Sequence, residues 1–170
     1  MGLKHSVASI MRRVPALHVL LIYLLNLVAA RFTVGVNGVV FNRQGQVLLL
    51  EHVFRSNHPW GVPGGWVGRR EEPRLALRRE LLEEVGLAVS VGPPVLIKLS
   101  GPPGHLETAF VCEVEGEGLV GRLSGEVIST QWVDVQDLPD GLKDLDREMI
   151  LQAHTMRVSA MTMQEQPGWA

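Results

Sequence analysis

The chain has little cysteine, few aromatic residues and almost no net charge. Cysteine and tyrosine each occur once among the 170 residues, and aromatic residues make up 5% of the total. Because Cys112 has no second cysteine to pair with, an internal disulfide is excluded, and we expect a cytoplasmic protein in a reducing compartment. A net charge of -2 gives no electrostatic reason to expect a nucleic-acid partner.

The rest of the composition is that of a globular protein. Hydrophobic residues make up 46% of the chain, and its length allows one domain to bury a sizeable core. No internal repeat or low-complexity segment is present. We expect an apolar helix within residues 1–31, a main domain over residues 32–157 and a C-terminal tail over residues 158–170.

The segment from Pro73 to Val85 predicts one helix. Proline suits the first helical turn, where its missing N–H costs nothing, and Gly86 suits the C-terminal end. At 100° per residue, five apolar side chains share one half of the helical wheel, and three glutamates cluster within about 100° on the other side. The apolar residues are Leu75, Leu77, Leu81, Leu82 and Val85, and the acidic ones are Glu80, Glu83 and Glu84.

The clustering of three glutamates on one side of this helix needs a physical explanation. Glu80 and Glu84 form a like-charge pair at i,i+4, which costs an isolated helix roughly 0.2–0.5 kcal/mol. Arg79, at i,i+4 from Glu83, relieves part of the repulsion, and a divalent cation would relieve more. Clustered carboxylates suit Mg2+, with Mn2+ as the alternative. A solvated acidic helix face is the other interpretation of these glutamates alone.

Further residues at fixed spacings surround these glutamates. They are Gly65, Glu71, Arg79, Glu80, Leu81, Glu83, Glu84, Gly86 and Leu87. Together they satisfy every defined position of the Nudix box, and the preceding segment from Trp60 to Gly65 resembles the usual entry to it. Two looser positions differ from the common pattern: Gly68 stands where an acidic residue is frequent, and Arg70 where glycine often precedes the glutamate. The chain therefore resembles the Nudix hydrolase family.

The resemblance implies an α/β fold in which a mixed β-sheet is sandwiched between α-helices. Hydrophobic runs predict strands at residues 32–41, 46–53, 89–100, 108–114 and 128–135. The segment 42–45 reads as a hairpin turn between the first two strands. A final helix is predicted from about Leu142 to Arg157.

The apolar segment from Val14 to Ala30 predicts an additional N-terminal helix. It would be about 25 Å long, somewhat short of a bilayer core, and most of its leucines lie on one half, opposite His18, Tyr23 and Asn26. Such a helix suits packing on the domain, on a second subunit as a homodimer, or on a membrane surface. A signal peptide cleaved near Ala30 is a further alternative, although it would leave Arg31 directly before the first strand.

The resemblance also implies the reaction. Nudix enzymes hydrolyse the diphosphate linkage of a nucleoside diphosphate joined to another group, with divalent metal ions. The family pattern assigns metal binding to the Gly65 carbonyl, Glu80, Glu83 and Glu84, and an orienting catalytic role to Arg79. The general base is expected to be Glu80 or Glu83. Some members take it from a later loop, where Glu126 is the candidate, followed by Glu115 and Glu117.

Substrate contacts are expected around the glycine-rich loop, residues 61–65. Arg55, Trp60 and Trp66 flank this loop. Glu126, in the loop before the predicted strand 128–135, is a further candidate for substrate contact. His52 and His58 are near enough in sequence to approach a phosphate. Tryptophan beside a tight turn also fits simple packing. Pro102 and Pro103 fall where ADP-ribose-type relatives often carry proline, which favours an ADP-ribose or ADP-sugar substrate slightly.

Three alternatives to this function follow from the same residues. One is a nucleoside triphosphate pyrophosphatase, and another is a module that senses a nucleotide without hydrolysing it. Sensing members of the family usually lose one or more box glutamates, whereas this chain keeps all of them. The third is a membrane-tethered enzyme that acts on a lipid-linked diphosphate through the apolar helix.

Overall fold

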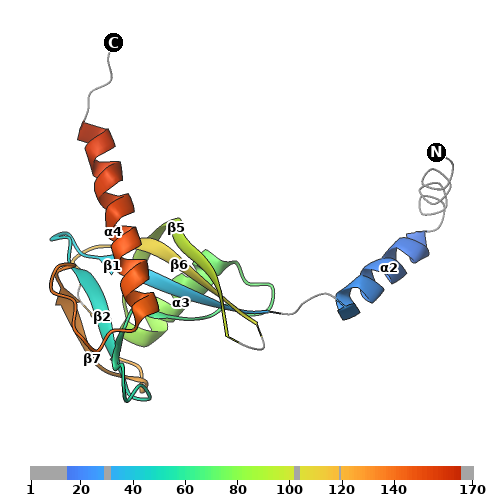
Figure 1. The fold of residues 1–170 in the computed structure, drawn as a ribbon, viewed down its shortest axis with the longest axis horizontal. Coiled ribbons are helices and arrows are strands. Elements are labelled where there is room, and N and C mark those ends of the chain that lie inside the picture. The colour runs from blue at the N-terminus through green and yellow to red at the C-terminus, as the bar shows by residue number, and fades with distance from the viewer. Residues whose placement is uncertain (1–14, 29–31, 102–103, 119, 166–170) are drawn as a thin grey trace, which may run out of the picture. The chain divides into compact units, whose positions relative to one another are not determined.

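The computed structural model describes residues 15–28, 32–101, 104–118 and 120–165 (Figure 1). Contacts divide the chain into two units, Met1–Arg31 and Phe32–Ala170. The first unit holds helix α2 (Pro15–Val28), and the second holds all the strands and two further helices. Each unit is described by itself below.

Helix α2 confirms the predicted apolar helix. Every side chain from Val19 to Leu25 is exposed, from 40% at Leu21 to 71% at Tyr23. The side chains of His18 and Asn26 lie outside the described residues, so their separation from the leucines stays a prediction. None of the helices in the described ranges is both long enough and apolar enough to cross a membrane.

Seven strands form one mixed sheet in the second unit. Strands β1 (Thr33–Phe41) and β2 (Val47–His52) form the predicted hairpin, and β6 (His105–Val114) lies parallel to β1. Strand β5 (Val89–Ser100) continues the sheet on the far side of β6, and β3 (Trp60–Gly61) lies at the opposite edge beside β2. Strands β4 (Gly64–Trp66) and β7 (Val127–Val133) pair with β1 and β2 respectively.

Helices cover both faces of this sheet. Because side chains alternate along a strand, one strand supplies core residues to both faces. Val36 and Val40 of β1 pack with helix α3 (Pro73–Val85), whereas Val39 and Phe41 pack with helix α4 (Asp144–Glu165). Figure 1 shows α4 in front of the strands and α3 behind them. The predicted sandwich of a mixed sheet between helices is confirmed.

The single cysteine lies in the core on the α3 side. Cys112 is fully buried, as its apolar surroundings in the sequence suggest. Burial raises the pKa of its thiol to about 12. The thiol therefore stays protonated and packs as a small apolar side chain.

Helix α3 has the predicted ends. Pro73 lies in the first turn, and the Glu72 side chain accepts a hydrogen bond from the Leu75 N–H. Gly86 adopts the left-handed conformation with φ 65°; its N–H donates to the Leu82 carbonyl oxygen, and the Leu87 N–H donates to that of Leu81. These caps fix where the helix begins and ends.

The apolar half of α3 is only partly buried. Leu75 and Leu82 are 58% and 61% exposed, whereas Ala76, Leu77, Leu81 and Val85 are buried. Two of the glutamates, Glu80 and Glu84, lie on the same side of the helix as the buried residues and face a cavity. The sheet therefore contacts a face of α3 that is part leucine and part carboxylate.

Helix α4 is longer than predicted. It begins at Asp144, close to the expected start, and continues to Glu165, beyond the expected end at Arg157. Its N-terminal half supplies the buried residues Met149, Ile150 and Ala153. Figure 1 shows its C-terminal half extending past the sheet. Residues 158–165, predicted as tail, are therefore helical.

Candidate active site

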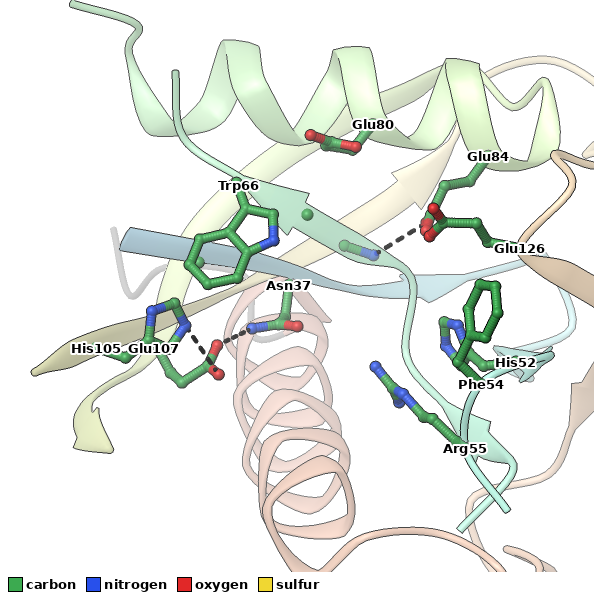
Figure 2. Close-up of a pocket in the computed structure, with 13 residues that line it drawn as sticks. Asn37, His52, Phe54, Arg55, Trp66, Glu80, Glu84, His105, Glu107 and Glu126 are labelled. Atoms are coloured by element: carbon green, nitrogen blue, oxygen red, sulfur yellow. Dashed lines mark hydrogen bonds and ion pairs between the residues drawn. The ribbon is translucent and has the colours of Figure 1, made fainter. Parts of the chain in front are cut away.

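The main cavity of the domain lies beside α3 and has a volume of about 470 Å³ (Figure 2). Its lining comes from β1, the segment after β2, the glycine-rich loop, α3, β6 and the loop before β7. The residues are Gly35, Asn37, His52, Phe54, Arg55, Gly64, Gly65, Trp66, Glu80, Glu84, His105, Glu107 and Glu126. This volume lies within the range of pockets that bind small molecules and cofactors.

Gly65 and Glu80 are in direct contact. The register of β1 and β4 places Gly65 opposite Val36 and turns its backbone toward α3. A Cβ atom on Gly65 would overlap the Glu80 carboxyl group, so only glycine lets this carboxylate approach the β4 backbone. The glycine of the motif thus has a steric role here.

Glu84 lies deeper in the cavity. Its carboxylate accepts a hydrogen bond of 3.2 Å from the Gly64 N–H (Figure 2). Its pKa is raised to about 7, mainly by burial and to a smaller degree by the negative charges of Glu80 and Glu126, against the opposing effects of the Gly64 hydrogen bond and Arg55. A buried carboxylate near two others is a position that a cation would stabilise.

Arg79 binds three of the acidic residues of the motif. It donates to both oxygens of Glu71 at 2.9 and 3.0 Å, to Glu80 at 2.8 Å and to Glu83 at 3.2 Å. It also donates to the Trp66 carbonyl oxygen at 3.1 Å. The hydrogen bonds to Arg79 lower the pKa of Glu71 and raise that of Arg79 itself. Arg79 therefore connects α3 to the glycine-rich loop.

The two departures from the common motif have structural counterparts. Arg70 has φ 62°, a left-handed conformation that favours glycine, which explains why glycine is frequent at this position. The Gly68 N–H donates a 2.7 Å hydrogen bond to the Glu71 carboxylate. Both residues shape the turn that leads into α3.

The donor types of the cavity fit a hard divalent cation. Glu80, Glu84 and Glu126 all contribute carboxylates to its lining, and oxygen ligands suit Mg2+ and Mn2+. Within the described ranges, however, no three His, Cys, Asp or Glu side chains are gathered closely enough to form a metal cluster. Glu83 lies apart from the cavity lining, 61% exposed and bound to Arg79. The oxygen donors of the cavity therefore match a divalent metal ion in chemical type. Their carboxylates lie farther apart in this structure than the ligands of a bound metal ion would.

The later-loop glutamates occupy different places. Glu126 lines the cavity, and Figure 2 shows its carboxylate directed to the same region as that of Glu84. Glu115 instead lies 3.7 Å from Arg78 at an exposed position, and Glu117 is exposed. Of these three glutamates, the structure brings only Glu126 to the cavity.

The residues predicted to contact substrate are partly brought together. Arg55, Trp66 and His52 line the cavity. Trp60 does not, because it lies in β3 and packs against the core on the α4 side. His58 is exposed and outside the lining. The substrate roles of these residues stay predictions.

A group of polar residues in the cavity has no counterpart in the sequence prediction. Asn37 donates a 2.8 Å hydrogen bond to Glu107, and His105 lies 3.2 Å from the same carboxylate (Figure 2). The Trp66 and His105 rings lie 4.7 Å apart and are tilted by 60°. A polar asparagine within the apolar run of β1, and the alternation of His105 and Glu107 in β6, were the available signals.

Sequence comparison identifies the family. The protein-family model described as the NUDIX domain matches residues 31–153 of this chain. The chain therefore belongs to the Nudix hydrolase family and is a hydrolase. A MutT-like protein from Streptomyces ambofaciens is 26% identical over 121 residues, which cover 71% of this chain and 76% of that protein.

Two further similar proteins carry names that refer to different substrates. An RNA pyrophosphohydrolase from Bartonella bacilliformis is 43% identical over 60 residues, which cover 31% of this chain and 35% of the relative. The crystal structure of an ADP-ribose pyrophosphatase from Streptococcus suis has a TM-score of 0.58 and 19% identity, covering 82% of this chain and 97% of that one. At 19% identity, the similarity to the Streptococcus suis structure concerns the fold alone.

Proposed function

We propose that this Nudix hydrolase is a metal-dependent pyrophosphohydrolase that cleaves the diphosphate linkage of a nucleoside diphosphate derivative. The observation that carries the proposal is one cavity lined by two of the three glutamates of the motif helix and by groups suited to a nucleotide. Glu80, Glu84 and Glu126 supply the acidic part, while Arg55 and Trp66 supply a cation and an exposed aromatic ring.

The charge of the lining favours metal dependence. Four glutamates line the cavity, and Arg55 is the one arginine or lysine among its lining residues. A diphosphate anion entering this cavity would meet net repulsion unless cations neutralised the carboxylates. Bound Mg2+ or Mn2+ would neutralise phosphate oxygens and lower the pKa of the attacking water.

The residues of this chain take distinct roles in the proposal. Glu80, Glu84 and the Gly65 carbonyl would hold the metal, and Glu83, which binds Arg79 in this structure, would be a further ligand. Arg79 orients Glu80 through its 2.8 Å hydrogen bond. Glu126 accepts the proton of the attacking water, because it lines the cavity and has no ion pair with another described residue. Glu80 and Glu83 both bind Arg79 in the structure, so their carboxylate oxygens are already engaged.

The nucleoside part of the substrate is proposed to lie near Trp66. This side chain is 61% exposed at the cavity and offers a ring face for stacking. An ADP-ribose or ADP-sugar substrate is the preferred candidate, because the proline pattern of the sequence favours it slightly. The proline signal at Pro102 and Pro103 lies outside the described residues. A nucleoside triphosphate or an RNA 5′ end is the alternative, supported by the Bartonella relative.

A substrate panel tests this proposal. The wild type and Glu84→Gln would be assayed with nucleoside diphosphate derivatives, triphosphates and triphosphorylated RNA, with Mg2+ or Mn2+. Phosphatase added afterwards reveals monophosphate products. Glu148→Gln is the matched control, because Glu148 of α4 binds Lys98 of β5 and does not line the cavity.

We expect metal-dependent turnover of one substrate class by the wild type and by Glu148→Gln, and a loss of about a hundredfold or more in Glu84→Gln. Intact nucleotide binding without turnover across the panel would instead support a sensing module. Equal activity of the wild type and Glu84→Gln would contradict the assignment of the site.

We further propose that the apolar surface of α2 contacts a lipid bilayer or a second copy of the chain. The exposed side chains from Val19 to Leu25 support this proposal. Flotation of the full-length chain with vesicles would support the bilayer, and a dimer by light scattering would support the second copy. A monomer that does not float would contradict both.

A further inference from the structure

Three polar atoms beside the cavity are buried without a hydrogen-bond partner among the described residues. They are His52 Nε2, Arg55 Nη1 and Asp146 Oδ2. Two of them face each other, because Arg55 Nη1 lies 3.6 Å from Asp146 Oδ2. The Asp146 side chain is 10% exposed and that of Arg55 is 32% exposed. An ion pair is thus present at a distance slightly longer than a hydrogen bond.

The two partners come from separate elements. Arg55 belongs to the loop between β2 and β3 and reaches the cavity, whereas Asp146 lies in the first turn of α4 and is not part of the cavity lining. Gly61 of β3 leaves room for both side chains. A Cβ atom there would overlap Arg55 and come within 3.0 Å of Asp146.

We propose that Asp146 is a positioning residue, which holds one side of the Arg55 guanidinium so that the other side faces the cavity and binds the diphosphate of the substrate. The guanidinium is a planar fork with donors on both sides, so it can bind a carboxylate and a phosphate at once. This inference rests on the proposed function, because it assigns the diphosphate-binding cation of that same cavity.

The charges around Arg55 support this role. Arg55 is the one arginine or lysine in a lining that holds four glutamates. His52 also lines the cavity, but burial and the positive charges of Arg55 and Lys143 lower its pKa to about 4. His52 is therefore neutral near pH 7, and Arg55 is the one arginine or lysine of the lining that can offer a positive charge to a phosphate.

A purely structural role for Asp146 is less consistent with the geometry. An acidic residue in the first turn stabilises a helix through the dipole, and exposed Asp144 already occupies that turn. Asp146 is buried instead, and a buried carboxylate costs free energy unless it is well paired. Burial raises its pKa to about 6, so near pH 7 the side chain is still mostly ionised and can pair with Arg55.

A double-mutant cycle tests the inference. The variants are Asp146→Asn, Arg55→Ala and the double substitution, with Asp144→Asn as the control from the same helical turn. Asp146→Asn is expected to raise KM by about tenfold with a much smaller change in kcat, since it misplaces a binding group. In the Arg55→Ala background the same substitution should have no further effect on kcat/KM.

Binding of inorganic pyrophosphate, measured by calorimetry in the presence of Mg2+, provides a readout that needs no turnover. Asp146→Asn and Arg55→Ala should weaken this binding by a similar factor, and Asp144→Asn should leave it unchanged. Arg55→Lys should also lose affinity, because an ammonium group cannot present two opposed donor sides.

The outcomes separate this inference from the proposed function. Coupled effects on pyrophosphate binding without hydrolysis of any substrate would support the positioning role and contradict the hydrolytic proposal. Hydrolysis with additive effects of the two substitutions would overturn the positioning role alone. Absence of saturable pyrophosphate binding by the wild type, or unchanged binding in Asp146→Asn, would also overturn it. Thermal denaturation of each variant identifies any that is unfolded. Should Asp146→Asn be unfolded, Asp146→Glu takes its place in the same cycle.

Discussion

Replacing Asp146 by asparagine should stabilise the folded protein at neutral pH while it weakens substrate binding. Asparagine keeps the shape of the side chain and removes its charge. Asp146 is buried in the first turn of α4, 3.6 Å from Arg55. The cost of holding a carboxylate at this position can be worked out from its pKa.

The magnitude follows from proton linkage. Burial raises the pKa of Asp146 from 3.8 to about 6, with a smaller contribution from Glu107 and against the effects of Arg55 and Lys143. The folded protein thus holds a proton that the unfolded chain releases between these values. The stability from the protonated acid is present below pH 3.8 and is lost as the pH rises through 6. At about 1.4 kcal/mol per pKa unit, the ionised carboxylate costs about 3 kcal/mol.

Urea denaturation of the wild type and Asp146→Asn between about pH 4 and pH 8 measures this cost. The free energy of unfolding of the variant should rise relative to the wild type by about 2–3 kcal/mol across that interval. His52, whose pKa is lowered to about 4, favours folding as the pH rises, but it is present in both proteins and cancels in the difference. Exposed Asp144→Asn should show no such trend. A difference constant within about 0.5 kcal/mol would refute the reasoning.

Three further predictions concern α3 and its surroundings. Mg2+ should raise the Tm of the wild type and not of Glu84→Gln, because the carboxylate that gains most from a cation is removed; equal shifts would contradict this. Gly86→Ala should cost about 1–2 kcal/mol in urea denaturation, since φ is 65° and the Cβ would come within 3.0 Å of the Gly121 Cα. Leu77→Ala should cost about 2–5 kcal/mol, against about 0.5 kcal/mol or less for exposed Leu75→Ala; the reverse order would refute the observed face of α3.

The sequence was sufficient for the architecture because its local signals agree with one another. Alternating apolar residues in β1 and β2, the turn between them, and the two ends of α3 are all set by neighbouring residues. The leucines of α3 mark its buried face only in part. Glu80 and Glu84 occupy part of that face, because a cavity rather than core lies beneath them. Leu75 and Leu82 are consequently exposed.

The cavity residues that the sequence predicted are those of the motif and a few others, among them Arg55, Trp66 and Glu126. Gly65, Glu80 and Glu84 lie in the cavity as the motif implies. Glu107 and Asp146 come from β6 and α4, and no local pattern marks them as neighbours of the motif. Strand pairing brings Glu107 beside Gly35 of β1, and the packing of α4 brings Asp146 to Arg55. Such contacts depend on the assembled fold.

Hydrolysis in water enriched with heavy oxygen tests the central claim most directly. The substrate turned over with Mg2+ would be digested in this water, and both products would be analysed by mass spectrometry. The account predicts one heavy oxygen atom on a phosphate group of one product and none on its sugar or leaving group, because water attacks phosphorus within the diphosphate linkage. Label on a carbon-bound oxygen, or two unlabelled products, would contradict it.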